Sequence, residues 1–300
     1  MLTGMYFTNQ RYIRGYKTML KRTYSIDGFV LELDKHSMLP LFQKENPMYD
    51  RFIPYLGEIA DKKRGVLIDI GANIGDTVAG IIKHTSQRII CIEPVKQFFE
   101  LLTKNVRNFG VPYSSRCELV NACIAGDSES NFILEVKNGN ARVKAHADDG
   151  FGDSETYTIP LLLKKKNIRL SDVSLIKVDT DGYDAECIMS IGEGLKTCSP
   201  VLFWENLFIV NNPEECSSYL SMYEYLDSCG YDNFFVFDNY GNYMANYTKK
   251  QLVDISDYMI RMRKKMSTLT FPYTDILACK PVDAEICTDA IRRYVKSFEH

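Results

Sequence analysis

Acidic side chains stand at the ends of three apolar runs whose lengths are typical of buried strands. Asp69 precedes a turn rich in glycine, and Glu93 follows the next run, 24 residues later. Asp179 and Asp181 follow a third run. Because the carboxyl ends of parallel strands meet at one edge of an open α/β sheet, we expect these side chains to face a common ligand there. Carboxylates in such positions accept hydrogen bonds from ribose hydroxyls, or take the proton of a reacting hydroxyl.

The turn that follows Asp69 has the sequence GANIGD, residues 71–76. Gly71 and Gly75 allow a tight turn and a close approach of the backbone to a ligand. The turn lacks the third glycine of a dinucleotide fingerprint, and Asp76, at the predicted start of a helix, would repel a phosphate. A cationic ligand without phosphate would be tolerated, which favours S-adenosylmethionine over a dinucleotide. The alternative is that Asp76 only caps the helix.

Strand and helix patterns alternate along the chain. Apolar runs predict strands at 66–70, 88–92, 118–123, 173–178, 200–204, 234–237 and 275–279, with helical periodicity between most of them. This alternation indicates an α/β fold with a mainly parallel sheet covered by helices on both faces. Residues 1–64 are predicted to form an N-terminal lobe, and residues 65–300 the cofactor-binding domain. Residues 138–156 are dense in Asn, Gly, Asp and Ser, which predicts a long functional loop.

The composition is that of a globular enzyme. The chain has 300 residues, a net charge of −3, 45% apolar and 25% charged residues. We see no long basic stripe, so we expect no nucleic-acid partner. Nine cysteines without a CxxC pair indicate buried thiols in a reducing cytosol. No signal peptide is evident and no run reaches the roughly 18 apolar residues of a membrane helix, so we expect a cytoplasmic protein. A homo-oligomer stays open.

Four ordered blocks of the sequence resemble the motifs of FkbM-type S-adenosylmethionine-dependent methyltransferases. They are DIGANIGD (69–76), Glu93-Pro94, KVDTDGYD (177–184) and PVLFWE (200–205). The family usually has Glu-Gly-x-Glu where this chain has DGYD, so its carboxylates are one methylene shorter. The resemblance implies a class I methyltransferase fold, a Rossmann-like sheet of seven mostly parallel strands whose last strand is antiparallel. It also implies methyl transfer to a hydroxyl of a sugar in a glycan, glycolipid or related precursor, or of a small natural product.

The resemblance also assigns roles to individual residues. It places S-adenosylmethionine against Asp69, Gly71, Ala72, Asn73, Gly75, Asp76, Thr77, Glu93, Ala122 and Cys123. Within this set Glu93 would bind the ribose, and Ala122 and Cys123 would flank the adenine. Asp179 and Asp181 would face the methyl group and the acceptor.

A sugar hydroxyl is a poor acid, so the reaction needs a base or a metal. Asp179 or Asp181 is the first candidate base, with a helix cap or a cofactor contact as the alternative role. His146 is the second candidate, and a solvated loop histidine is its alternative. Asp179, Glu205 and Asn206 could also offer three oxygen ligands to Mg²⁺, unless the last two only bind loops or substrate.

Two other functions stay open. A nicotinamide-dependent oxidoreductase uses a similar sheet, although Asp76 and the missing third glycine argue against it. A non-catalytic cofactor-binding scaffold is the other, and the retained carboxylates Asp179, Asp181 and Glu205 argue for catalysis instead.

Overall fold

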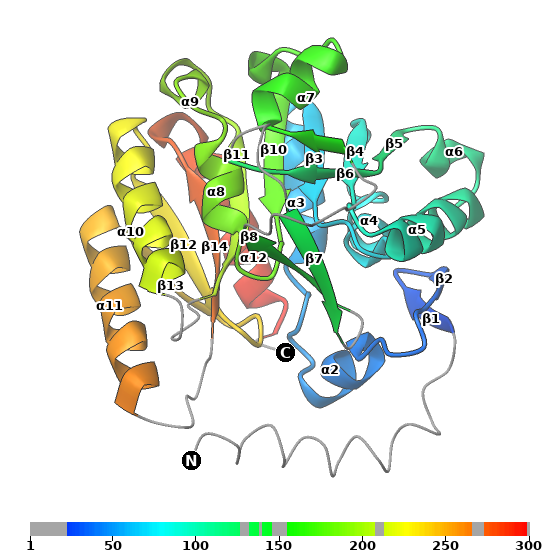
Figure 1. Ribbon diagram of the computed structural model, residues 1–300, viewed down its shortest axis with the longest axis horizontal. Helices are drawn as coiled ribbons and strands as arrows, with labels where there is room; N and C mark the ends of the chain where they lie inside the picture. Colours follow the sequence, from blue (N-terminus) through cyan, green and yellow to red (C-terminus); the bar gives the residue numbers. More distant parts are fainter. Residues whose placement is uncertain are drawn as a thin grey trace.

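The computed structural model describes residues 23–126, 132–137, 140–145, 155–207, 213–265 and 273–298. These residues form a three-layer α/β structure, in which a central sheet lies between two layers of helices (Figure 1). Within this part of the chain, none of the helices combines the length and the apolar character that a membrane span requires.

The central sheet has eight strands in the order β13-β12-β14-β11-β10-β3-β4-β5. Their bounds are β3 Val66–Ile70, β4 Ile89–Ile92, β5 Cys117–Val120, β10 Val173–Val178, β11 Val201–Asn206, β12 Asn233–Asp238, β13 Tyr243–Tyr247 and β14 Thr274–Cys279. The five strands from β5 to β11 are parallel to their neighbours. Strand β14 runs antiparallel between β11 and β12, and β13 pairs antiparallel with β12. The mainly parallel sheet with an antiparallel last strand is confirmed, and β13 adds an eighth strand that we did not predict.

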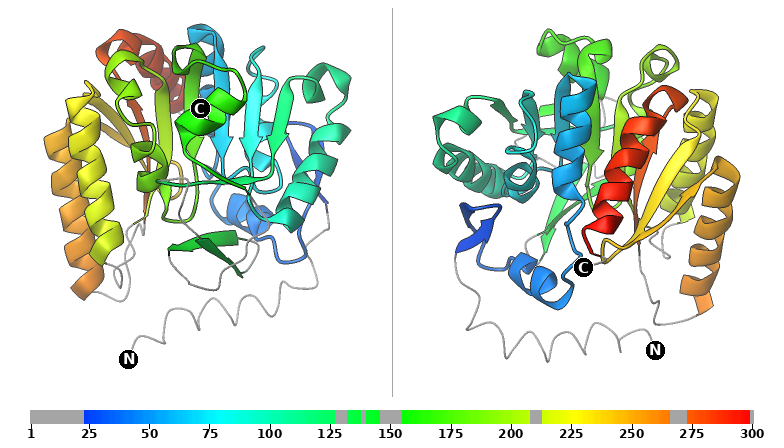
Figure 2. Two further views of the ribbon diagram at one scale, coloured as in Figure 1. Left: turned by 45° about the horizontal axis from the view of Figure 1, so that its top comes forward. Right: turned by 180° about the vertical axis from the view of Figure 1, so that it is seen from behind.

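Helices cover both faces of this sheet, as two apolar clusters show (Figure 2). One face carries α3 (Ile53–Lys63), α4 (Asp76–Ile81), α5 (Lys96–Asn108) and α12 (Ala284–Lys296). The other carries α7 (Ile159–Lys165), α8 (Asp184–Met189), α9 (Gly194–Thr197), α10 (Pro213–Ser228) and α11 (Lys249–Lys265). The short helices α2 (Leu39–Glu45) and α6 (Val111–Ser114) and the 3-10 turns η1 (Leu170–Asp172) and η2 (Pro281–Asp283) complete the set. Leu56 of α3 is buried in the same cluster as Leu67 of β3, so the segment before residue 65 shares the core of the sheet.

Three two-stranded sheets lie outside the central one. They pair β1 (Thr23–Ile26) with β2 (Phe29–Glu32), β6 (Ala122–Ile124) with β9 (Glu155–Tyr157), and β7 (Phe132–Lys137) with β8 (Asn140–Ala145). The predicted strand 118–123 is therefore two strands, because the chain leaves β4 after Val120 and pairs with β9 instead. The predicted loop 138–156 contains β8, whose polar residues pair with β7.

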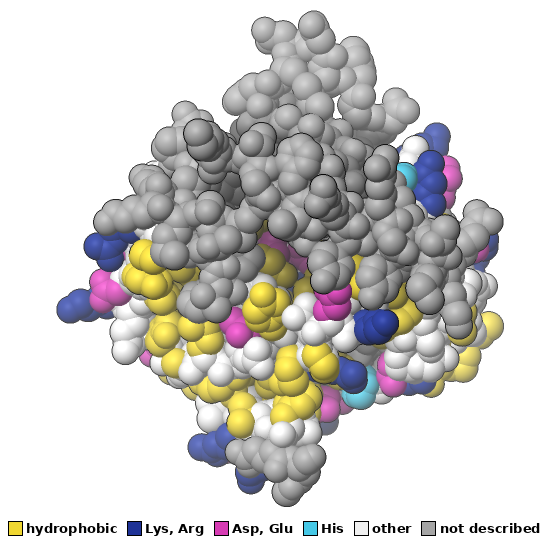
Figure 3. Space-filling view, turned by 90° about the horizontal axis from the view of Figure 1, so that it is seen from below, with side chains coloured by type: hydrophobic (Ala, Val, Ile, Leu, Met, Phe, Trp, Pro, Cys, Tyr) yellow, Lys and Arg dark blue, Asp and Glu magenta, His cyan; other side chains and the backbone are white. Residues whose placement is uncertain are grey.

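The alternation of side chains along the strands decides what faces the site. Lys177 of β10 is paired with Asp69 of β3, on the face that α3, α4 and α12 cover. On the next strand Phe203 and Glu205 lie on this same face, while Trp204 and Asn206 face α10 and α11. Charged residues from different strands thus form a row at one edge of the sheet, the lower edge in Figure 1. Figure 3 shows the molecule from that side, with single acidic side chains among hydrophobic ones.

Candidate active site

The glycine turn joins the ends of three strands. The Gly71 N–H donates to the Ile92 carbonyl at 2.9 Å, and the Asp179 N–H donates to the Ile70 carbonyl at 3.0 Å. Gly71 has φ +80, and a Cβ at this position would lie 1.8 Å from the Asp179 carbonyl oxygen. A side chain here would therefore collide with the backbone of β10. Gly71 is needed for the contact between strand ends, a reason that the sequence pattern alone did not supply.

Glu93 holds the rest of the turn. It is 3% exposed, and its two carboxylate oxygens accept the N–H groups of Asn73 and Val95 at 2.9 and 2.8 Å. Burial raises its pKa to about 7 against the effect of these two donors. Cys123 is also buried, and burial together with Glu93 raises the pKa of its thiol to about 12. Glu93, which directly follows β4, and Cys123 of β6 therefore lie close enough to interact electrostatically.

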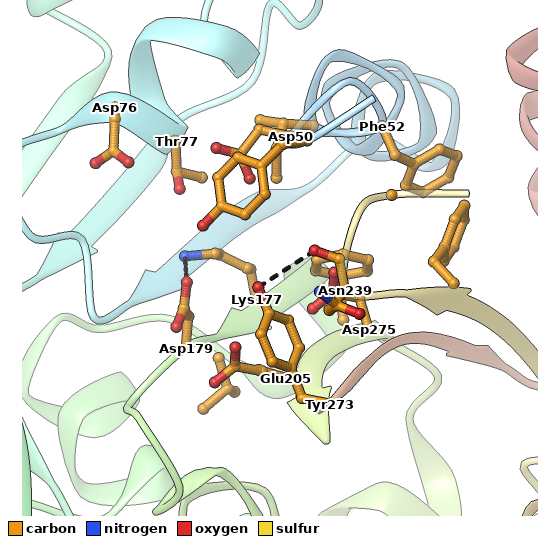
Figure 4. Close-up of a pocket in the computed structure, with 16 residues that line it drawn as sticks. Asp50, Phe52, Asp76, Thr77, Lys177, Asp179, Glu205, Asn239, Tyr273 and Asp275 are labelled. Atoms are coloured by element: carbon orange, nitrogen blue, oxygen red, sulfur yellow. Dashed lines mark hydrogen bonds and ion pairs between the residues drawn. The ribbon is translucent and has the colours of Figure 1, made fainter. Parts of the chain in front are cut away.

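A buried ion pair lies beneath the turn. Lys177 is 3% exposed, and its ammonium lies 3.3 Å from Asp69 and 3.2 Å from Asp179 (Figure 4). Burial raises the pKa of the fully buried Asp69, and the charge of Lys177 opposes that shift. Burial alone would lower the pKa of Lys177, but Asp179 and Asp69 outweigh it, so that pKa is raised. Each side chain thus offsets part of the cost of burying the other.

The carboxylate of Asp69 retains acceptor capacity. Its contact with Lys177 is an ion pair without the direction of a hydrogen bond, and neither oxygen accepts a hydrogen bond from the described residues. A buried carboxylate in this state fits a ligand with an N–H donor or a positive charge. The amino group and sulfonium of S-adenosylmethionine have this chemistry, so the residues present fit the predicted cofactor.

The DGYD block is organised by its last residue. Asp184 is fully buried and accepts hydrogen bonds from the Thr180 hydroxyl at 2.8 Å and from the Thr180, Gly182 and Glu205 N–H groups at 3.3 Å. Burial, with Asp179 as the second cause, raises its pKa to about 7. Asp184 thus ties the loop after β10 to the end of β11. Asp181 lies in this loop at φ +55, half-buried.

A cavity opens at this edge of the sheet and encloses about 710 Å³, including its part open to solvent (Figure 4). Four of the predicted site residues line it: Asp76, Thr77, Asp179 and Glu205. The others lie outside its lining: Asp69, Gly71, Ala72, Asn73, Gly75, Glu93, Ala122, Cys123, Asp181 and Asn206. Several lining residues were not predicted: Tyr49, Asp50, Lys177, Asn239, Tyr273 and Asp275. Asp275 and Lys177 had a sequence signal, since each is a charge inside an apolar run.

The predicted metal set is not brought together. Asn206 is 1% exposed and points to the face opposite Glu205, where its amide donates to the Thr274 hydroxyl at 3.3 Å and accepts from the Tyr223 hydroxyl. Neighbouring residues of one strand cannot both reach Asp179, which corrects the assignment of Asn206. The described residues contain no group of three His, Cys, Asp or Glu that could hold a metal. His146, the second candidate base, lies outside the described residues.

The strand order, the antiparallel β14 and the acid at the end of β4 define a class I methyltransferase fold. Residues 69–232 match the family described as the methyltransferase FkbM domain, so the chain belongs to this family and is an S-adenosylmethionine-dependent methyltransferase. A comparison with functionally curated proteins gave no significant match.

Solved structures with a similar course of the chain are also methyltransferases. An O-methyltransferase from Bacillus cereus, in complex with S-adenosylhomocysteine, is 10% identical, with a TM-score of 0.44 over 90% of this chain and 97% of that one. An O-methyltransferase of tomaymycin synthesis from Streptomyces achromogenes is 10% identical, with a TM-score of 0.44 over 90% and 96%. A structure titled as a putative RNA methyltransferase from Pyrococcus horikoshii is 13% identical, with a TM-score of 0.37 over 91% and 98%.

Proposed function

We propose that the enzyme is an O-methyltransferase and that its acceptor is a hydroxyl of a sugar in a glycan, a glycolipid or a related biosynthetic precursor. The observation that carries the proposal is the position of Asp179. Its side chain is 50% exposed on the cavity, while its carboxylate is held by the buried Lys177 at 3.2 Å. A small natural product with a hydroxyl group is the second candidate acceptor, because the same geometry serves it.

The cofactor would lie across the glycine turn. Asp69 would accept its amino group, Glu93 its ribose hydroxyls, and Ala122 and Cys123 would flank its adenine. Gly71, Ala72, Asn73, Gly75, Asp76 and Thr77 would form the wall around its methionine part. When bound, S-adenosylmethionine supplies a methyl group on a positively charged sulfur. The carboxylates at this edge favour that charge over the phosphates of a dinucleotide.

Asp179 or Asp181 would take the proton of the acceptor hydroxyl while the new carbon–oxygen bond forms. Lys177 donates a hydrogen bond to the Asp179 carboxylate at 3.2 Å and so keeps it at one place. Asp184 fixes the loop that carries Asp181, so both candidate bases are positioned by buried partners. Exchange of Asp181 for Asn should leave cofactor binding near normal and lower the rate of transfer at least about tenfold.

Calorimetric titration with S-adenosylhomocysteine is the first test. Binding at micromolar ligand is expected, and absence of binding at high micromolar ligand would remove the proposal. A fluorescence titration with NADH addresses the oxidoreductase alternative, and we expect no binding there. Transfer of a labelled methyl group to a panel of methyl glycosides, followed by location of the label, then tests the acceptor. An unchanged turnover of Asp181→Asn would exclude that residue as the base.

A further inference from the structure

The cavity has a second wall that the cofactor assignment does not use. Glu205 belongs to β11, Asp275 to β14, and Asn239 directly follows β12. In the sheet, β11 is separated from β3 by β10, and β14 and β12 lie still further from the glycine turn. The polar groups of this wall therefore face the part of the cavity that is left for the acceptor. We call Glu205, Asp275 and Asn239 the distal wall.

The two carboxylates of the distal wall oppose one another. Strands β11 and β14 are antiparallel, and Glu205 is the direct partner of Asp275 in their register. Like charges directly opposite on paired strands destabilise a sheet. Burial and the neighbouring Asp179 raise the pKa of both groups well above the usual range of carboxyls. This arrangement costs stability in the protein alone, and a positive charge between the two groups would relieve it.

Asn239 gives an independent indication of a ligand. It is 8% exposed and lines the cavity, and its side-chain oxygen is buried without a hydrogen-bond partner among the described residues. A buried acceptor without a donor is uncommon in a folded protein and calls for a donor from a ligand. Asn239 and Asp275, which lie close together (Figure 4), therefore both favour a ligand group that donates hydrogen bonds.

The charged residues of the whole cavity also favour a positively charged ligand group. Its described lining contains the carboxylates of Asp50, Asp76, Asp179, Glu205 and Asp275, the phenols of Tyr49 and Tyr273, and one cation, Lys177. That cation is already held by Asp69 and Asp179. Where these carboxyls are ionised, a phosphate or carboxylate on the acceptor would meet repulsion. A metal ion needs ligands that converge on one point, and no such group occurs in the described residues. An ammonium group is satisfied by acceptors that are spread around it.

We propose that the acceptor carries a protonated amine close to the hydroxyl that receives the methyl group, and that the distal wall binds this amine. The inference rests on the proposed O-methyl transfer and adds the class of substrate, an amino sugar or another amino alcohol with a free amine. The amine is recognised and not methylated, because an ionised amine has no free electron pair. Phosphorylated and acidic sugars are excluded from this position by the same charges.

The test compares three sugars of the same ring configuration and different charge on the full chain saturated with S-adenosylhomocysteine. The probes are the methyl glycosides of glucosamine, N-acetylglucosamine and glucuronic acid. We expect the glucosaminide to bind at least tenfold more tightly than the acetylated sugar, and the glucuronide more weakly still. Equal binding of the first two, or tighter binding of the glucuronide, would overturn the proposal. Binding that requires Mg²⁺ and is lost with EDTA would overturn it as well.

Two variants test whether the distal wall causes the preference for the glucosaminide. Asp275→Asn removes one carboxyl of the distal wall, and Asn239→Leu removes the unpaired acceptor while it keeps the number and branching of the side-chain heavy atoms. Both should reduce the preference for the glucosaminide over the acetylated sugar to less than threefold. The matched control is Asp254→Asn on the exposed side of α11, which should keep the full preference. Asn239→Leu buries no new polar group, so its unfolding temperature should be unchanged, and a full preference in this folded variant would contradict the proposal.

Proton release gives a second measurement. Binding of an ammonium should lower the pKa of Glu205 and Asp275 and release protons near neutral pH. The apparent binding enthalpy of the glucosaminide should therefore change between phosphate and Tris buffers, and that of the acetylated sugar should not. The groups that act electrostatically on this wall are Asp50, Asp179, Asp181, Asp184, Lys177 and Tyr273. If S-adenosylhomocysteine fails to bind, the proposed function fails; if it binds and the sugars are not distinguished, this inference alone fails.

Discussion

The two sides of the site, the cofactor side around the glycine turn and the distal wall of the cavity, differ in how their carboxylates are satisfied. On the cofactor side, formed by β3, β4 and β10, Glu93 accepts two backbone N–H groups and Asp69 faces the ammonium of Lys177. On the distal wall, Glu205 and Asp275 oppose each other and the oxygen of Asn239 has no partner among the described residues. On the first side, groups of the protein itself satisfy the carboxylates. The second side has hydrogen-bond acceptors that need a donor from a ligand. In the proposed assignment, the first side binds the cofactor and the second selects the acceptor.

The largest loss of stability is expected at Gly71, where the two sides meet. In Gly71→Ala the new Cβ would lie 1.8 Å from the Asp179 carbonyl oxygen, at a backbone φ of +80 that side chains rarely adopt. The ends of β3 and β10 must then separate, and we expect a loss of roughly 5 kcal/mol in the free energy of unfolding. Chemical denaturation measures this loss, and titration with S-adenosylhomocysteine measures the loss of the site.

Gly192→Ala is the matched control for that prediction. Gly192 has φ +65, but a Cβ there would meet no atom within 4 Å. Only the cost of the left-handed backbone remains, which is about 1–2 kcal/mol. Equal destabilisation by the two substitutions would show that backbone conformation, and not the contact between strand ends, makes Gly71 necessary.

The second effect concerns the buried ion pair of the cofactor side. Lys177→Met leaves Asp69 buried without its positive partner, and we expect a loss of about 3 kcal/mol in the free energy of unfolding. Addition of Asp69→Asn should restore at least about 1 kcal/mol of it, because the uncompensated charge is then gone. Urea denaturation of the four proteins of this double-mutant cycle measures both values. Additive losses would mean that the two side chains act independently.

The two sides also differ in how far the sequence predicted them. The strands that end in Asp69, Glu93 and Asp179 were found, because buried parallel strands are continuous apolar runs and a charge at their end stands out. Two residues of the distal wall were missed, because Asp275 lies on the antiparallel strand β14 and Asn239 directly after β12, and no local pattern encodes the order of these strands in the sheet. Asn206 was assigned wrongly because the predicted strand ended at residue 204. The observed β11 continues through Asn206, and the alternation turns its amide away from the cavity.

The third prediction tests whether the two sides are independent. In Glu93→Gln one carboxylate oxygen becomes an amide N–H₂, which cannot accept the N–H of Asn73 or Val95 that it faces. The turn should shift, and the affinity for S-adenosylhomocysteine should fall about tenfold, which corresponds to about 1.4 kcal/mol. Calorimetry measures this affinity, with the exposed Glu285→Gln on α12 as control. The preference of the distal wall for glucosaminide should be unchanged, and its loss would show that the sides are coupled.

The smallest effect is a dependence of stability on pH that both sides share. Burial raises the pKa of Asp184 from 3.8 to about 7 in the folded chain, so between these values the folded state binds more protons than the unfolded state. Stability contributed by this group is complete below pH 3.8 and is lost as the pH rises through 7. We expect the free energy of unfolding, without ligand, to fall by about 1 kcal/mol between pH 6 and pH 8 from this residue. Asp184→Asn cannot titrate and should flatten the profile by that amount, whereas Asp254→Asn should not. A wild-type protein that is more stable at pH 8 than at pH 6 would contradict the assignment of Asp184 as the buried acid that joins the two sides.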